Sequence, residues 1–355
     1  MLDDAIDLLQ QMIATPSVSR DEAAVATLIY DRFVAWGLRP VRYGNNIVAK
    51  ASTWEADRPT LMLNAHIDTV RPAASYTIDP YTPLLRDGRL YGLGSNDDGA
   101  SVVALTSAFR RLRDESLPYN LLLALSAEEE VGGEGGMRML LPALAQEGIS
   151  IDAALVGEPT GMQPAIAERG LIVLDCVTHG VAGHAARNEG INAIYRAMDD
   201  INRLRDFRFD RTSAILGPVK VSITQIEAGK QHNTVPDTCR WVVDVRTTDA
   251  YSNEETSRLL REALSPHTEA VHRSTRVQAS VIADTHPLVK GAVALGRTPF
   301  VSPTTSDMSL MHGIPSLKMG PGDSSRSHRA DEYILVSEIA EAINLYTTLL
   351  TDLTL

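Results

Sequence analysis

Short apolar runs that alternate with helix-like patterns constrain the fold of this 355-residue chain more than any other feature. Continuous apolar runs lie at residues 60–65, 120–125 and 152–156, and the stretches 100–112 and 136–145 repeat apolar residues with a helical period. Such runs are typical of strands buried on both faces, and their alternation with helices is typical of parallel or mixed sheets. We therefore predict an α/β fold with a mixed, mostly parallel sheet covered by helices.

The pattern changes between residues 169 and 283. The runs 171–178 and 241–246 look like half-exposed strands, and two helical stretches lie among them. This texture indicates a small α+β insert with an antiparallel sheet, after which the α/β pattern resumes. Because the chain is long for a single core, we predict two domains, one made of residues 1–168 and 284–355 and the other of the insert.

The bulk composition narrows the classes of function. The net charge of −12 argues against binding to nucleic acid or to an anionic membrane surface. Cys176 and Cys239 are far apart without a Cys-x-x-Cys partner, so they predict neither a disulfide framework nor a cysteine zinc site. The acidic N-terminus lacks the basic start of a secretion signal, and no apolar run approaches the length of a membrane span. We expect a cytoplasmic protein.

Histidine and acidic side chains stand where the predicted strands end. His66 directly follows the first apolar run. Glu129 and Glu130 follow the second run, and Glu158 follows the third in a Gly-Glu-Pro-Thr turn. Because ligands gather at the carboxyl ends of strands in such sheets, we expect these side chains to converge. Asp68 is spaced to accept the second ring N–H of His66 and so to fix the tautomer of that ring. We therefore predict that Asp68 is a catalytic residue.

Two further candidates follow glycine turns. Asp97 comes after Gly92 and Gly94, which allow a sharp turn, and His328 comes after the Gly-Pro-Gly loop that begins at Gly320. Each candidate alone also fits an ordinary loop, a solvated acidic turn or an exposed histidine. Candidates at five places in the chain, each after a strand or a glycine turn, are hard to explain by chance. Nitrogen and carboxylate ligands beside an acidic base are typical of a two-metal hydrolytic site.

These motifs resemble those of one metallopeptidase family over essentially the whole chain. It is the family of acetylornithine deacetylase, succinyl-diaminopimelate desuccinylase, aminoacylase and the glutamate carboxypeptidases. Its pattern is a His-x-Asp, a Gly-x-Gly-x-x-Asp, an acid before Glu-Glu-x-Gly, a Gly-Glu-Pro and a late His before Asp-Glu. The chain departs from it twice: Glu128 stands where Asp is usual, and Asp98-Gly99-Ala100 stands where Met-Lys-Gly is common.

The resemblance implies a zinc-peptidase-like fold and a ligand set for two divalent cations. Asp97 would bridge the two ions. His66 and Glu158 would complete one site, and Glu130 and His328 the other. Zinc is the expected metal, with cobalt or manganese as alternatives.

The resemblance also implies roles outside the ligand set. Glu129 would be the general base that takes a proton from the water bridging the metals. The insert resembles the family's lid and dimerisation domain, so the chain is expected to form a homodimer. His184 in Gly-His-Ala-Ala matches a histidine that reaches the active site of the partner. Asn233 and Arg246 match residues that meet the substrate carboxylate, and Gly320 is a further substrate-binding candidate.

The expected function is hydrolysis of the amide bond of an N-acyl amino acid, as by an acetylornithine deacetylase in arginine biosynthesis. A succinyl-diaminopimelate desuccinylase-like deacylase, or a dipeptidase or carboxypeptidase with the same dinuclear site, remains an alternative. A non-catalytic metal-binding protein is disfavoured because all five ligand positions and Glu129 are present. A dehydrogenase that binds NAD is disfavoured because no Gly-x-Gly-x-x-Gly follows the first strand.

Overall fold

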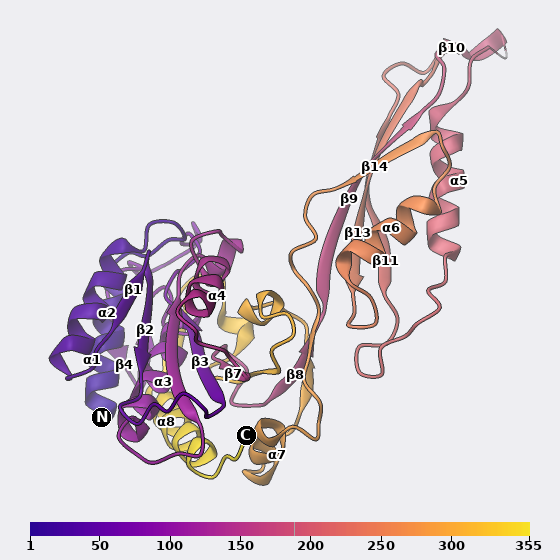
Figure 1. Cartoon of the computed structure of the whole chain (residues 1–355). Helices are drawn as coiled ribbons and strands as arrows, with labels where there is room; N and C mark the ends of the chain where they lie inside the picture. Colours follow the sequence, from indigo (N-terminus) through magenta and orange to yellow (C-terminus); the bar gives the residue numbers. More distant parts are fainter. Residues whose placement is uncertain (188) are drawn as a thin grey trace. The chain divides into compact units, whose positions relative to one another are not determined.

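The computed structural model describes residues 1–187 and 189–355, which divide into two compact units (Figure 1). Unit 1 comprises Met1–Ile166, Ile282–Val301 and Ser306–Leu355. Unit 2 comprises Ala167–Val281 and Ser302–Thr305. No helix among the described residues is long and apolar enough to cross a membrane.

A mixed sheet forms the centre of unit 1, with the strand order β1-β2-β6-β3-β7-β17-β8. Its strands are β1 (Val41–Tyr43), β2 (Asn46–Lys50), β3 (Thr60–His66), β6 (Asn120–Ser126), β7 (Ala153–Val156), β8 (Ala165–Glu168) and β17 (Ser316–Lys318), and the short strands β15 (Ser280–Val281) and β16 (Phe300–Ser302) pair with β8. The central strands β6, β3, β7 and β17 run parallel, whereas β1, β2 and β8 pair antiparallel. The predicted fold class is confirmed.

Helices cover both faces of this sheet. They are α1 (Leu2–Ile13), α2 (Ala23–Ala35), α3 (Gly99–Leu112), α4 (Met137–Gln146), α7 (Pro287–Ala294) and α8 (Val336–Thr351). Successive residues of β3 point to opposite faces. Leu61, Leu63 and Ala65 join a core with residues of α1, α2, α3 and α8, whereas Met62 joins a second core with residues of α4. Because β3, β6 and β7 are buried and parallel, their carboxyl ends meet at one edge, where the candidate site lies.

A small three-stranded sheet, ordered β18-β5-β4, completes unit 1. Its strands are β4 (Leu84–Arg86), β5 (Arg89–Tyr91) and β18 (Tyr333–Leu335). It joins the chain just before Asp97 to the chain just after His328, because Tyr333 pairs with Tyr91. The segments that carry Asp97 and His328, which are remote in sequence, are therefore both attached to this sheet.

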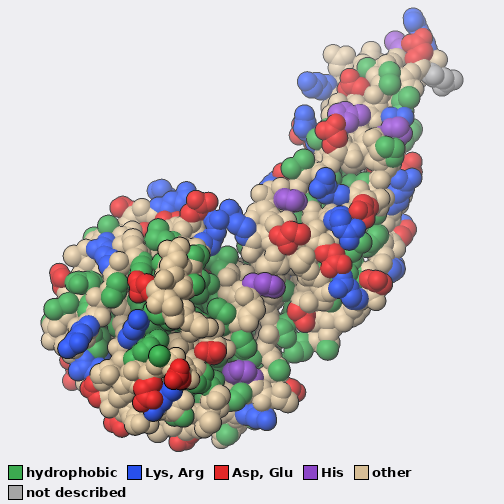
Figure 2. All heavy atoms as spheres, viewed as in Figure 1, with side chains coloured by type: hydrophobic (Ala, Val, Ile, Leu, Met, Phe, Trp, Pro, Cys, Tyr) green, Lys and Arg blue, Asp and Glu red, His purple; other side chains and the backbone are tan. Residues whose placement is uncertain are grey.

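The described residues of unit 2 form an antiparallel sheet, ordered β11-β13-β9-β14, a separate pair of strands, β10 and β12, and the helices α5 and α6. Its elements are β9 (Gly170–His179), β10 (Gly183–His184), α5 (Ala193–Asp206), β11 (Lys220–Ala228), β12 (Thr234–Val235), β13 (Thr238–Thr247), α6 (Asn253–Glu262) and β14 (Thr268–His272). Alternate residues of β9, among them Ile172, Leu174 and Cys176, are buried in one core with Ala193 and Ala197 of α5. Acidic and basic side chains are interspersed on the visible face of both units (Figure 2).

Candidate metal centre

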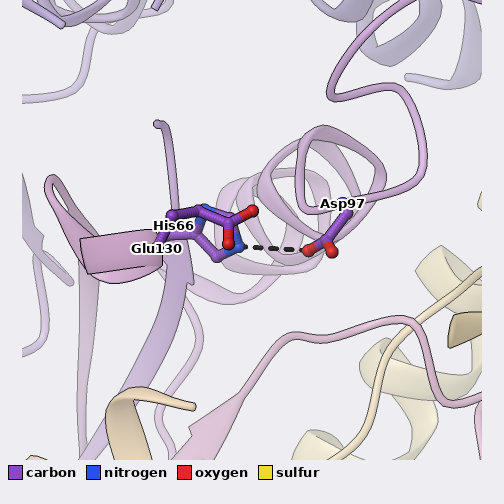
Figure 3. Close-up of side chains that lie close together, drawn as sticks. All are labelled: His66, Asp97 and Glu130. Carbon is purple, nitrogen blue, oxygen red and sulfur yellow. Dashed lines mark hydrogen bonds and ion pairs between the residues drawn. The ribbon is translucent and has the colours of Figure 1, made fainter. Parts of the chain in front are cut away.

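His66 is the last residue of β3, and its side chain is buried, with 2% exposed. Its Nε2 atom lies 3.2 Å from Oδ1 of Asp97 (Figure 3). The ligand atoms of His66, Asp97 and Glu130 all lie within 4.8 Å of one another, and those of His66, Glu129 and Glu158 do the same. The structure thus brings five of the predicted residues together around one imidazole, as two overlapping groups of three.

The ring of His66 is held from its other side. Its Nδ1 atom lies 2.9 Å from the main-chain carbonyl oxygen of Asp68 and 3.5 Å from the carboxylate of the same residue. The N–H on Nδ1 is therefore donated to Asp68, so Nε2, which faces Asp97, is the ring atom in position to bind a cation. Burial opposes a charge on His66, but the carboxylates of Asp68 and Asp97 outweigh it and raise the pKa of His66 well above its usual value.

Buried carboxylates fix the turn that carries the acids after β6. The side chain of Asp68 accepts the main-chain N–H groups of Glu129, at 3.0 Å, and Glu130, at 3.2 Å. Glu22, which is also buried, accepts the N–H of Glu128 at 3.2 Å. Three successive amides are thus satisfied by two side chains, so the directions of the Glu129 and Glu130 side chains are set from behind.

Glu128, the departure from the family pattern, contacts the glycine-rich loop that follows it. Its carboxylate accepts the N–H of Gly135 at 3.2 Å. A Cβ atom at Gly133 would lie 1.8 Å from this carboxylate, and one at Gly135 would lie 2.4 Å from it. The glycines of this loop therefore make room for the longer glutamate side chain.

His328 brings the second half of the predicted ligand set to Asp97. Its Nε2 atom lies 3.0 Å from Oε1 of Glu130 and 3.7 Å from Oδ2 of Asp97. Asp97 therefore turns one oxygen toward His66 and the other toward His328, which is the arrangement that a bridging carboxylate requires. The His328 side chain is 55% exposed, whereas those of Asp97 and Glu130 are 12% and 9% exposed.

Burial and neighbouring acids raise the pKa of the remaining acids of the centre. Burial raises the pKa of Glu129 well above its usual value, and the negative charges of Glu158 and Asp307 add to this rise. Burial does the same to the pKa of Glu158, where the charge of Lys318 opposes the shift and that of Asp97 reinforces it. Buried carboxylates that face one another are stable as anions only beside positive charge. Histidine nitrogen and carboxylate oxygen are a donor set that suits zinc and related divalent cations.

Two buried carboxyl groups beside the centre have little signal in the sequence. Asp307 accepts the hydroxyl of Ser126, at the end of β6, at 2.6 Å, and burial raises its pKa to about 6. An oxygen of Asp98 lies 3.4 Å from the main-chain N of His66, and burial raises the pKa of Asp98 to about 8. Asp98 stands at a departure from the family pattern, whereas Asp307 follows neither a predicted strand nor a glycine turn.

Gly320 lies two residues after the end of β17, in unit 1. A Cβ atom there would lie 2.4 Å from the main-chain oxygen of Glu158 and 2.6 Å from the hydroxyl of Ser101. The hydroxyl of Thr160 accepts the N–H of Gly320 at 3.1 Å. Glycine at this position lets the chain approach the backbone of the predicted ligand Glu158.

Three predicted residues belong to unit 2. His184 ends the short strand β10, which pairs with β12, and Asn233 immediately precedes β12. Both residues are exposed. Arg246 on β13 forms a two-pronged ion pair with Asp244, with distances of 2.8 and 3.1 Å. The guanidinium group expected to meet a substrate carboxylate thus already holds a carboxylate of its own strand.

The sequence is similar to a known protein family and to curated proteins. The model of peptidase family M20/M25/M40 matches residues 62–352. The succinyl-diaminopimelate desuccinylase of Parvibaculum lavamentivorans is 26% identical, and the match covers 98% of this chain and 95% of that protein. The corresponding protein of Xanthomonas campestris is 29% identical over 99% of this chain and 100% of its own length.

Solved structures share the fold at lower identity. Aminopeptidase PepT from Bacillus cereus superposes with a TM-score of 0.78 at 19% identity, covering 99% of this chain and 98% of its own. The YXEP protein of Bacillus subtilis, described as a dinuclear metal-binding peptidase, has a TM-score of 0.74 at 16% identity, covering 99% and 97%. Because the family model extends over most of the sequence, the chain belongs to peptidase family M20/M25/M40 and is a metallohydrolase that acts on amide bonds.

Proposed function

We propose that this chain removes an acyl group from an N-acyl amino acid, with two divalent cations bound by His66, Asp97, Glu130, Glu158 and His328. The observation that carries the proposal is the placement of Asp97, whose two oxygens face His66 and His328 separately. A carboxylate in that position can serve two ions at once. Zinc is the proposed metal, and cobalt or manganese would suit the same ligands.

Two cations would supply Lewis acidity and a water of lowered pKa. The residues of the chain provide the rest of the chemistry. Glu129 lies beside His66 and Glu158, so its carboxylate can take the proton of the attacking water and pass it to the leaving amine. Asp68 orients both the ring of His66 and the turn that carries Glu129, so it fixes the position of the proposed base relative to the proposed ligand.

Among the acyl groups, we favour succinyl over the acetyl group that the sequence first suggested. The support is that full-length relatives at 26% and 29% identity are succinyl-diaminopimelate desuccinylases. An N-succinyl group, unlike an acetyl group, also carries a free carboxylate of its own, which suits an arginine-based clamp. Arg246 would bind the substrate carboxylate only by giving up its bonds to Asp244, and Asn233 and Gly320 are proposed to help place the substrate.

We further propose that residues 169–283 form a lid and dimerisation domain and that His184 serves the active site of the partner in a homodimer. His184 and Asn233 flank the paired strands β10 and β12, so the two residues are held close together on unit 2. The two buried, free cysteines suit a reducing compartment such as the cytoplasm.

A substrate panel tests the proposal. Metal-verified protein is assayed on N-succinyl, N-acetyl and dipeptide substrates with added zinc or cobalt, and N-succinyl amino acids are expected to give the highest kcat/KM. A strong chelator should abolish the activity, and added metal should restore it. Faster cleavage of dipeptides would make the protein a peptidase. Hydrolysis by exhaustively chelated apoprotein would refute the metal centre.

A further inference from the structure

Glu332 holds the turn that delivers Asp97. Its carboxylate accepts the main-chain N–H groups of Asn96 at 2.8 Å, Asp97 at 2.9 Å and Gly94 at 3.1 Å. Its own carbonyl oxygen accepts the N–H of Gly92 at 3.0 Å. Glu332 is buried, with 3% exposed, so these amides are satisfied inside the protein by one residue.

A second set of hydrogen bonds, made by the side chain of Asn96, joins the same turn to the segment before His328. The side chain of Asn96 donates to the carbonyl oxygen of Asp323 at 3.1 Å and to the hydroxyl of Ser327 at 3.2 Å, and it accepts the N–H of Asp323 at 3.0 Å. A Cβ atom at Gly322 would lie 2.3 Å from the Asn96 side chain, so the contact is close. His328 is thus bracketed by contacts to the Asp97 turn on both of its sides along the chain.

We propose that Glu332 is a positioning residue that sets the separation of Asp97 and His328 and thereby the affinity of the cation site that contains His328. Glu332 lies four residues after His328, so the bonds from its carboxylate tie one predicted ligand segment directly to the other. Three main-chain N–H groups of the Asp97 turn converge on this one carboxyl group, so the two segments are joined at several points at once. This inference rests on the proposed ligand roles of Asp97 and His328.

Cobalt binding to the whole protein tests the role. In Glu332→Gln, an NH₂ group replaces one carboxylate oxygen and faces a main-chain N–H. Both groups are donors, so at least one of the hydrogen bonds to the Asp97 turn is lost, whereas the size of the side chain is kept. We expect two-site calorimetry to show one cobalt site weakened about 10–100-fold, the usual cost of removing a partner that orients a ligand. The visible absorption of the cobalt in that site should change with it. His328→Ala identifies the affected site, and adding Glu332→Gln to it should cause little further loss.

The neighbouring Asp331 provides a matched control. Its carboxylate accepts the N–H groups of Thr77 at 2.9 Å and Ile78 at 3.3 Å and the hydroxyl of Thr77 at 2.6 Å. Asp331→Asn therefore removes bonds of the same kind from the same segment, but to a part of the chain that carries no predicted ligand. We expect it to keep the cobalt isotherm of the wild type. An equal loss of cobalt affinity in Asp331→Asn would show a general structural effect and overturn the proposal.

A second variant keeps the proposal testable if Glu332→Gln fails to fold. Asn96→Ala loosens the same junction from its other side, and we expect the same selective weakening of the site that contains His328. Two unchanged cobalt sites in Glu332→Gln, or in Asn96→Ala where only that variant folds, would refute the positioning role and leave the metal centre standing. Wild-type protein that binds no cobalt would refute the metal centre itself and this inference with it.

Discussion

The two units each bury carboxylates, but in different surroundings. In unit 2, Asp200 on α5 is fully buried and accepts the N–H and hydroxyl of Ser265 at 2.9 and 2.7 Å, the hydroxyl of Thr268 at 2.6 Å and a guanidinium N–H of Arg203 at 3.1 Å. In unit 1, burial raises the pKa of both Glu129 and Glu158, and neighbouring acids add to the rise: Glu158 and Asp307 for Glu129, and Asp97 for Glu158.

We interpret this difference as the one between a structural carboxylate and a predicted metal ligand or base. Asp200 finds its donors within the chain, so it connects α5 to Ser265 and to the first residue of β14 and needs no further partner. The acids of unit 1 are instead held from behind, through the backbone amides of their turns, with their carboxyl groups turned toward one another. Such an arrangement keeps side chains in place for a cation that the chain does not itself supply.

The largest expected effect separates base from ligand within unit 1. Glu129→Gln should keep both metals and lose activity by several orders of magnitude, since general-base catalysis alone contributes about 10²–10⁴-fold. Glu130→Gln and Asp97→Ala should lose metal as well as activity. Elemental analysis and kcat, measured on the same preparations, decide the matter. If Glu129→Gln sheds both metals while Glu130→Gln keeps them, the two roles are reversed.

The next prediction asks whether unit 2 contributes more than a scaffold. If His184 serves the partner's site, mixing inactive His184→Ala and Glu129→Gln protein under conditions of subunit exchange should restore part of the activity. In each mixed dimer, one site would combine an intact Glu129 with an intact His184. Activity is compared with that of each variant incubated alone. The absence of rescue despite proven exchange would mean that His184 acts in its own chain or has no catalytic role.

A smaller effect is expected at Asp200. In Asp200→Asn, an NH₂ group faces donors that the carboxylate accepts, so the free energy of unfolding should fall by about 1–3 kcal/mol. The kcat/KM of the folded enzyme and its metal content should not change. Denaturant unfolding measures the first quantity, and Asp199→Asn, at the exposed neighbouring position, is the control. Loss of metal from Asp200→Asn would break the distinction between the two units.

The sequence predicts the strand ends of unit 1 because burial on both faces leaves an unmistakable apolar run. The structure places His66, Glu129 and Glu158 close together just beyond the runs that become β3, β6 and β7. The supports of the site are not predictable in this way. Glu332 binds a turn more than 230 positions earlier in the chain, as its separation of 238 from Gly94 shows, and neither segment has a periodic pattern.

The ion pair of Asp244 with Arg246 is a different case. Residues two apart on a strand share one face, so the spacing alone permitted the contact. The resemblance to the family directed Arg246 toward a substrate instead, and the competing carboxylate was visible in the same motif. Local geometry of this kind is readable from a sequence, whereas contacts between remote loops require the folded chain.

The smallest expected effect concerns an exposed carboxylate of unit 2, Asp175, which completes the comparison. Arg273 donates to both of its oxygens, at 2.9 and 2.8 Å, and this lowers the pKa of Asp175. The folded protein therefore binds the proton more weakly than the unfolded chain, whose aspartate has a pKa of about 3.9. The ion pair stabilises the fold above that pH, and its contribution is lost as the pH falls through the lower pKa of the folded state.

In Arg273→Gln, the pKa of Asp175 should rise toward its usual value in an NMR titration. Stability at pH 7 should fall only slightly, and less in high salt, because exposed pairs are screened. An unchanged Asp175 titration in Arg273→Gln would show that the pair does not persist in solution.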